Sequence, residues 1–324
     1  MQRLIFTLTL IICGILCGYL CRLTAGCGNR RYLGAIPRFR KLLLQVSMLG
    51  IMPVSFLGVI WIIPFADLRV IFLPLIGLTT LLYGGLLGLA AARLLGKTGS
   101  QKAVLYCCGS FSNIGSIGGL ASFLFFGEHG FALLALYKIF EEVVYFGIGF
   151  PIARYIKSAD ESLSFSERIS QLWKDPFLMA VMICFPAGLL LNLPGTPRPA
   201  GYETLNSIFV PLGIFMILMS IGLGLHFTGI REHLRAAAMI SLIKFALMPL
   251  FAGTFAWLLG FHDIDNGLPF KVVLLASSMP VAFNAIVAAS LYDLDLDLAN
   301  TCWLLTTGAL LLVLPWLSFL FSIL

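Results

Sequence analysis

Two short polar stretches interrupt otherwise apolar segments, and they hold the residues best suited to bind a small ligand. The first runs from Gly109 to Gly119 and contains one asparagine, three serines and four glycines, and the second runs from Ser277 to Asn284 around Pro280. Glycine adds backbone freedom and proline removes an N–H donor, so neither stretch favours a continuous helix. We therefore predict that each stretch breaks a helix.

A broken helix in a low-dielectric environment has free N–H groups at its new N-terminus, and the helix dipole favours an anion there. Asn113 and Asn284 can donate and accept hydrogen bonds without carrying charge. For either stretch alone the alternative is helix packing, because Gly and Ser permit close approach and Asn can bond to a neighbouring helix. The ligand interpretation predicts the substrate-binding residues Ser112, Asn113, Gly115, Ser278, Pro280 and Asn284.

Four ionisable residues lie inside apolar segments, where such side chains are costly and usually face a cavity or a partner. Lys138 can reach Glu141 at i+3 and Glu142 at i+4, which is typical of a local ion pair. Coupling to protons or another ion is the second interpretation, and direct substrate contact is the third. Lys244 could neutralise a substrate anion, pair with one of these glutamates, or extend to the membrane surface.

No motif predicts an enzyme, a cofactor or a metal site. The chain contains neither H-E-x-x-H nor G-x-S-x-G, and no Ser/His pair lies deep in apolar segments. Asp293, Asp295 and Asp297 have the spacing of a calcium loop, but Leu298 and Leu304 replace its glycine and its bidentate glutamate. We expect these aspartates to cap a helix instead.

The composition shows what surrounds these residues. Of 324 residues, 60% are apolar and 11% are charged, whereas soluble proteins have about 45–50% and about 25%. A soluble domain of this size could not cover itself with so few charges. The sequence therefore predicts an all-α polytopic membrane protein, because long apolar segments satisfy their backbone groups in lipid only as helices.

We predict ten transmembrane spans, each near the roughly 20 residues needed to cross the hydrocarbon. They cover 4–21, 42–63, 70–92, 103–126, 131–153, 177–193, 205–227, 237–260, 271–290 and 299–321.

Positive charges predict the orientation, because short cytoplasmic loops retain Lys and Arg. With both termini outside, 15 of the 21 Lys and Arg residues are cytoplasmic, 4 are external, and Lys138 and Lys244 lie within spans. The net charge of +6 thus reflects topology and gives no reason to expect nucleic-acid binding. The short loops fit a bacterial inner membrane.

The polar loop 154–176 divides the spans into five before and five after. An odd-numbered unit that is repeated must insert the second time with inverted topology, as in many secondary transporters. We therefore predict a first repeat at residues 1–153 and an inverted repeat at 177–324. The two broken helices, spans four and nine, then occupy matching positions, where such transporters bind their substrates.

Several short motifs resemble the auxin efflux carrier family, whose bacterial members include malate and malonate permeases. The resemblance covers essentially the whole chain and rests on Ser110–Gly115, Gly127–Gly130, Lys244–Leu250, Met279–Asn284 and Tyr292–Asp293. It implies two inverted five-helix repeats, a scaffold of spans 1, 2, 6 and 7, a mobile transport domain from the rest, and a homodimer. One departure is that span four has no proline, whereas plant members have proline at both crossovers.

Together these features predict a secondary transporter of a small organic anion, a mono- or dicarboxylate, working by alternating access with H⁺ or Na⁺ as coupling ion. The alternatives are a passive channel and a symporter of the sodium/bile-acid type. An integral membrane enzyme is a further alternative that no motif favours.

Overall fold

The computed structural model describes residues 2–27, 30–62, 67–157, 176–224 and 230–324. Regular secondary structure in these ranges is helical, apart from an isolated β-bridge between Ser112 and Val281. Within the described residues, seven helical stretches are long and apolar enough to cross a membrane. The chain is thus an all-α polytopic membrane protein, as the sequence predicted. Most of the predicted connecting loop 154–176 lies outside the described residues.

The chain divides into two compact units. Unit 1 comprises Met1–Pro64, Gly119–Ala135 and Asp175–His226, and unit 2 comprises Phe65–Gly118, Leu136–Lys174 and Phe227–Leu324. Each unit takes segments from both halves of the sequence, so neither coincides with a predicted five-helix repeat. Unit 1 holds predicted spans 1, 2, 6 and 7, the set that the resemblance assigns to a scaffold, together with residues 119–135.

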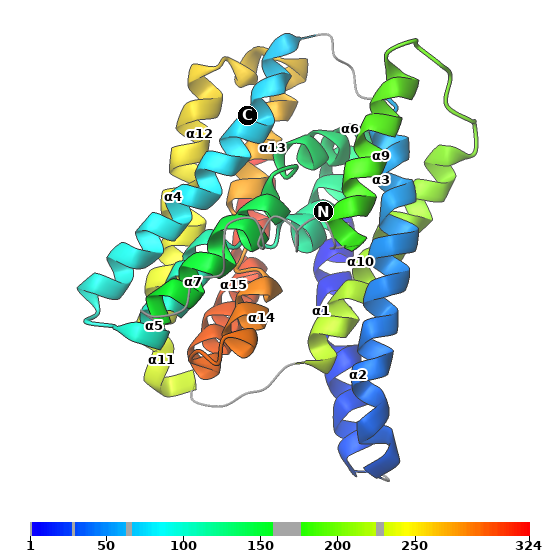
Figure 1. Cartoon of the computed structure of the whole chain (residues 1–324). Helices are drawn as coiled ribbons and strands as arrows, with labels where there is room; N and C mark the ends of the chain where they lie inside the picture. The colour runs from blue at the N-terminus through cyan, green and yellow to red at the C-terminus, as the bar shows by residue number, and fades with distance from the viewer. Residues whose placement is uncertain (1, 28–29, 63–66, 158–175, 225–229) are drawn as a thin grey trace. The chain divides into compact units, whose positions relative to one another are not determined.

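Unit 1 is a helical unit whose central contact is made by glycine. Within it, α1 packs along α10, where a Cβ on Gly18 or Gly222 would meet the backbone of the other helix. Small residues allow this approach in membrane proteins. The elements of unit 1, labelled in Figure 1, are α1 (Gln2–Cys27), α2 (Arg30–Gln45), η1 (Val46–Ile51), α3 (Met52–Ile60), the first part of α6 (Gly119–Tyr137), α9 (Pro176–Asn192) and α10 (Tyr202–Leu223).

Helix α6 bends at Gly127, whose φ of 70° and ψ of −159° are not helical. The next residue, Glu128, anchors the bend within unit 1. Arg198 donates to both of its carboxylate oxygens, at 2.9 and 2.6 Å, and Asn206 Nδ2 donates to one of them at 2.6 Å. Bidentate Arg–carboxylate pairs are among the stronger hydrogen-bonded contacts, which explains part of the Gly127–Gly130 motif.

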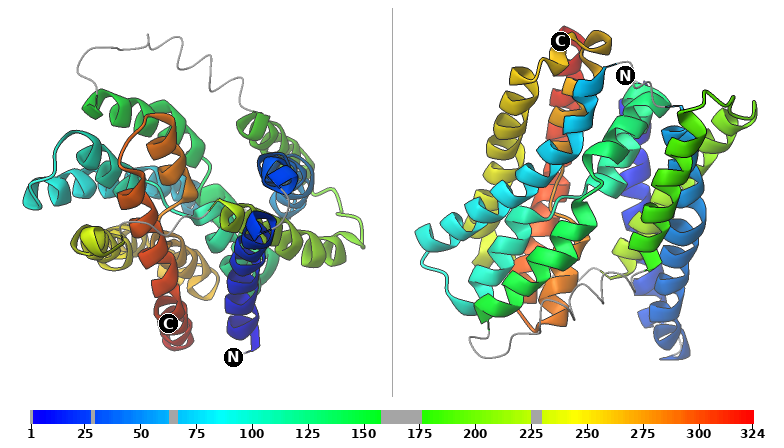
Figure 2. Two further views of the ribbon diagram at one scale, coloured as in Figure 1. Left: turned by 90° about the horizontal axis from the view of Figure 1, so that it is seen from below. Right: turned by 45° about the horizontal axis from the view of Figure 1, so that its top comes forward.

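Unit 2 contains the broken helices and the elements that surround them. Helix α4 packs closely on α5 through Gly84, Gly88 and Gly109, and Figure 2 shows these helices from two further directions. The elements of unit 2 are η2 (Leu68–Phe72), α4 (Leu73–Leu94), α5 (Gly99–Ser110), η3 (Ile114–Gly118), the end of α6, η4 (Val143–Gly149), α7 (Phe150–Lys157), α11 (Ile230–Leu242), η5 (Ile243–Leu247), α12 (Met248–Leu258), η6 (Phe261–Asp263), η7 (Asp265–Gly267), α13 (Leu268–Ser277), α14 (Phe283–Leu291) and α15 (Leu296–Ile323).

Predicted spans four, five and nine are not continuous helices. Span four divides between α5 and the helical stretch formed by η3 and the first part of α6. Span nine divides between α13 and α14. Span five is interrupted by a turn at residues 138–140, between α6 and η4. Span six forms the 17-residue helix α9. Fewer long helices than predicted spans are found in the described residues, seven against ten, because several predicted spans are short or interrupted.

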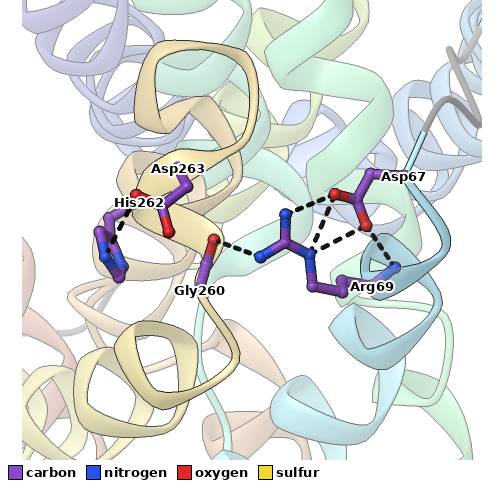
Figure 3. A network of polar contacts seen from close by, with 5 residues as sticks. All are labelled: Asp67, Arg69, Gly260, His262 and Asp263. Carbon is purple, nitrogen blue, oxygen red and sulfur yellow. Dashed lines mark hydrogen bonds and ion pairs between the residues drawn. The ribbon is translucent and has the colours of Figure 1, made fainter.

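A polar contact joins the loops that precede α4 and follow α12 (Figure 3). The Arg69 guanidinium binds Asp67, with Nη2 2.6 Å from Oδ2, and its Nη1 donates to Gly260 O at 3.1 Å. The side-chain hydrogen bond from Arg69, followed by that from its backbone N–H, lowers the pKa of Asp67. Because both side chains are partly exposed to solvent, the energetic contribution of this pair is small.

The glycine contact between α1 and α10 gives a stability prediction. Gly222→Ala should lower the melting temperature of the purified protein in detergent, because the added Cβ meets the backbone at Ile15 and overpacking costs roughly 1–3 kcal/mol. Gly308→Ala is the matched control, since a Cβ there has no heavy atom within 4 Å. Equal melting temperatures for the two variants would contradict the packing described.

Candidate functional site

Both polar stretches interrupt their helices within unit 2. Helix α5 ends at Ser110, and Phe111 is extended with φ −81° and ψ 121°. Helix α13 ends at Ser277, and the chain is again extended at Ala282, with φ −71° and ψ 150°, before α14 begins. Span four breaks without a proline, because its serine- and glycine-rich sequence supports an extended segment followed by the new helical turn η3.

The two extended segments lie side by side and pair as a short antiparallel ladder. Ser112 and Val281 form the bridge. Asn113 N donates to Pro280 O at 2.8 Å, and Ala282 N donates to Phe111 O at 3.0 Å. Each break therefore satisfies backbone groups that the other has freed, and the predicted residues of both stretches come together.

Two residues that the sequence analysis did not select complete this pairing. Val281 N donates to Thr306 Oγ1 of α15 at 3.2 Å, and Ser112 N donates to Tyr145 Oη at 2.8 Å. Tyr145 stands four residues after Glu141, so its helical spacing was a usable signal. Thr306 gives no such signal, because a threonine hydroxyl in a helix commonly bonds back to its own turn, as this one does to Cys302 O at 2.8 Å.

Asn113 lies at the start of the second half-helix of span four and is 6% exposed. Its Oδ1 accepts hydrogen bonds from Ser116 Oγ and, at 3.4 Å, from Ile117 N. Its Nδ2 is buried and has no hydrogen-bond partner in the part of the chain described. An unsatisfied buried donor costs about 1–3 kcal/mol, and an acceptor brought by a ligand would recover that energy.

The other predicted binding residues surround the same crossing. Asn284 is the second residue of α14 and is half-buried. Ser278 is the buried C-cap of α13. A Cβ added to Gly115 would lie 2.5 Å from Lys138 Nζ, so only glycine leaves room for that ammonium group.

The charged residues of span five lie beside the break in span four. Lys138 Nζ is 2.9 Å from Glu141 Oε2, so the predicted local ion pair is present. Tyr145 Oη lies 2.9 Å from Glu141 Oε1 and 2.6 Å from Ser112 O, and its one proton can be donated to only one of them at a time. Glu142 is half-buried immediately before η4.

Lys244 is directed into the break of span four. Its side chain is 0% exposed, and Nζ donates to Gly109 O and to Ser112 Oγ, each at 2.7 Å. It therefore does not extend to the membrane surface. Among the described residues no carboxylate forms an ion pair with it, so pairing with a span-five glutamate is not observed either.

One of the three aspartates before span ten, Asp295, caps that helix. Asp295 Oδ1 accepts a hydrogen bond from Leu298 N at 2.9 Å, and Gln101 Nε2 donates to its Oδ2 at 2.8 Å. The capping interpretation is thus confirmed for Asp295. The described ranges contain no group of three or more His, Cys, Asp or Glu side chains placed to hold a metal ion.

A polytopic helical protein with two broken helices that meet at a polar crossing has the architecture of a membrane transporter. The model of the family described as membrane transport protein matches residues 175–318. An uncharacterized transporter of Methanothermobacter thermautotrophicus is 27% identical over 250 residues, 76% of each chain. An uncharacterized transporter of Methanocaldococcus jannaschii is 27% identical over 252 residues, 75% of this chain and 77% of its own.

The chain is therefore similar to membrane transport proteins over the second half of its sequence, and to two uncharacterized transporters over about three quarters of its length. The residues matched by the family model include Lys244, the second break and most of α15.

The Lys138–Glu141 pair gives a second stability prediction. Lys138→Met alone should destabilise the protein by roughly 3–5 kcal/mol, because it leaves the buried Glu141 carboxylate without its ion-pair partner. Glu141→Gln alone should also destabilise the protein, because it removes the same ion pair. The double variant should lose less than the sum of the two. A double-mutant cycle of unfolding free energies in detergent measures the difference, and strictly additive losses would show that the pair makes no energetic contribution.

Proposed function

We propose that the protein is a secondary transporter of a small organic anion, a mono- or dicarboxylate, that works by alternating access. The observation that carries the proposal is the buried, unpaired Nδ2 donor of Asn113 at the crossing of the two broken helices. The match to a membrane transport protein model and the similarity to two uncharacterized transporters support transport in general. The chemistry of the crossing supports an anionic substrate.

The proposed anion site consists of donors at the starts of two half-helices. The first N–H groups of a helix have no intrahelical partner and carry the positive end of the dipole. Asn113 adds a side-chain donor at one start, and Asn284 adds another at the start of α14. A carboxylate accepts several such bonds at once, and hydrogen bonds to a charged group contribute about 1.5–3 kcal/mol each.

We further propose that Glu141 couples transport to protons. Its carboxylate contacts Tyr145, which also contacts Ser112 in the break. Protonation of Glu141 would change which oxygen receives the Tyr145 proton, and so would change the hydrogen bonding of the crossing. The charged groups near this carboxylate are Lys138, Glu142 and Lys244. Na⁺ is the alternative coupling ion.

The proposal includes a topology of ten spans in two inverted five-helix repeats, with both termini outside. The predicted setting is a homodimer in a bacterial inner membrane. The support for inversion is the placement of the two breaks in the fourth and ninth spans and the excess of Lys and Arg in the loops assigned to the cytoplasm. The division of the chain into two compact units is compatible with alternating access.

The anion site is tested by Asn113→Ala. We expect binding of the carboxylate substrate to weaken roughly 10- to 100-fold, the equivalent of one lost charged hydrogen bond. A thermal-shift panel of small mono- and dicarboxylates identifies a ligand, and binding and proteoliposome uptake are then measured with it. Ser277→Ala is the control, because Ser277 Oγ bonds to Val273 O within its own helix. Uptake by Asn113→Ala equal to that of the control would remove Asn113 from the site.

The coupling proposal is tested by Glu141→Gln, which keeps a hydrogen-bonding side chain but cannot exchange a proton. We expect uptake driven by a pH gradient to be lost, while exchange of labelled for unlabelled substrate continues. Glu203→Gln is the control, since Glu203 is exposed in the first turn of α10. An unchanged pH profile of uptake would reject the role of Glu141.

A further inference from the structure

The C-terminal ends of the two broken half-helices are satisfied in different ways. At the end of α13, Ser278 N donates to Leu274 O and Leu275 O, so the backbone itself covers the final carbonyls. At the end of α5, Phe111 N reaches Cys107 O, and Gly109 O is left to receive Lys244 Nζ. One break thus closes with its own backbone, and the other uses a cation from η5.

The atoms that Lys244 contacts are those that a small metal cation would use. A helix C-terminus carries negative partial charge, and in broken-helix transporters unwound carbonyls and half-helix C-terminal ends coordinate Na⁺. A backbone carbonyl and a serine hydroxyl are oxygen ligands of this kind. Here Gly109 O and Ser112 Oγ both lie 2.7 Å from the ammonium nitrogen.

Burial and charge support a structural cation at this position. The Lys244 side chain is fully buried, and no carboxylate in the described ranges forms an ion pair with it. A buried charge without a salt-bridge partner is costly unless hydrogen bonds and fixed dipoles stabilise it. The final turn of α5 provides both, because Gly109 O accepts a hydrogen bond from Lys244 Nζ. Lys138, by contrast, forms an ion pair with Glu141.

We propose that the Lys244 ammonium group is a built-in cation that takes the place of a bound metal ion at the C-terminal end of α5. The break of span four then keeps its geometry without Na⁺, and transport does not require Na⁺. The structural role of Lys244 does not depend on the proposed function. The statement about the coupling ion does rest on it, and it restricts that ion to protons.

The wild-type protein provides the first test, by thermal melting in detergent without substrate. NaCl and N-methylglucamine chloride at equal ionic strength should give the same melting temperature. A stabilisation specific to Na⁺ would overturn the proposal, because the position would then not replace a metal site.

Variants of Lys244 provide the second test. Lys244→Ala should melt several degrees lower, and ethylammonium chloride or NaCl should raise its melting temperature with concentration by mass action, whereas N-methylglucamine chloride should not. Lys244→Met fills the same space without charge and should melt low with no recovery. Lys244→Gln keeps a donor without charge and should also melt low. Wild-type stability in Lys244→Gln, or no recovery of Lys244→Ala by either cation, would overturn the proposal.

The folding of Lys244→Ala during purification gives a further outcome. Folded protein that is obtained only in ethylammonium chloride or NaCl supports the proposal. Failure to obtain folded protein in either salt contradicts the proposal. Because melting needs no substrate, the result is independent of the anion site: unchanged uptake by Asn113→Ala would remove Asn113 from that site and leave the Lys244 measurements standing.

Discussion

Backbone N–H and C=O groups freed by a helix break must find partners away from water, since each unsatisfied group costs free energy comparable to a lost hydrogen bond. The two breaks meet this constraint by pairing with each other, through Phe111 with Ala282 and Asn113 with Pro280. A single break would need side chains for every freed group. Two breaks side by side need only a few, and these positions are filled by Thr306, Tyr145 and Lys244.

Because the two backbones pair with each other, a side-chain hydrogen-bond donor at the crossing is left available to bind a ligand. The extended segments consume backbone donors and acceptors, while the side-chain donor of Asn113 stays unused and buried. Buried polar groups in a structural core normally have hydrogen-bond partners. A buried donor without a partner is therefore expected at a site that binds a ligand.

Charge is arranged around the crossing in two forms. Lys138 and Glu141 form a neighbouring ion pair on one element, whereas Lys244 reaches the break from a distant part of the sequence and binds the end of α5. Tyr145 connects Glu141 to the backbone at Ser112. One hydroxyl group therefore contacts both the Glu141 carboxylate and the crossing. The geometry of the crossing also depends on residues that are more than 130 positions apart, such as Lys244 and Gly109.

The sequence by itself determined the class of protein, the positions of both breaks, a local ion pair of Lys138 with Glu141 or Glu142, and a cap among the three aspartates before span ten. These follow from local rules: apolar length, the backbone preferences of Gly and Pro, and side-chain spacing along one helix. Tertiary structure alone decided which groups the breaks bind, why Lys244 points inward, and that Thr306 joins the site. No pattern in one segment encodes the distance to another, so contacts between elements distant in sequence, such as Lys244 with Gly109, appear only when the helices pack. The sequence did not predict the turn at residues 138–140 within span five. No glycine or proline stands at these positions to indicate a turn.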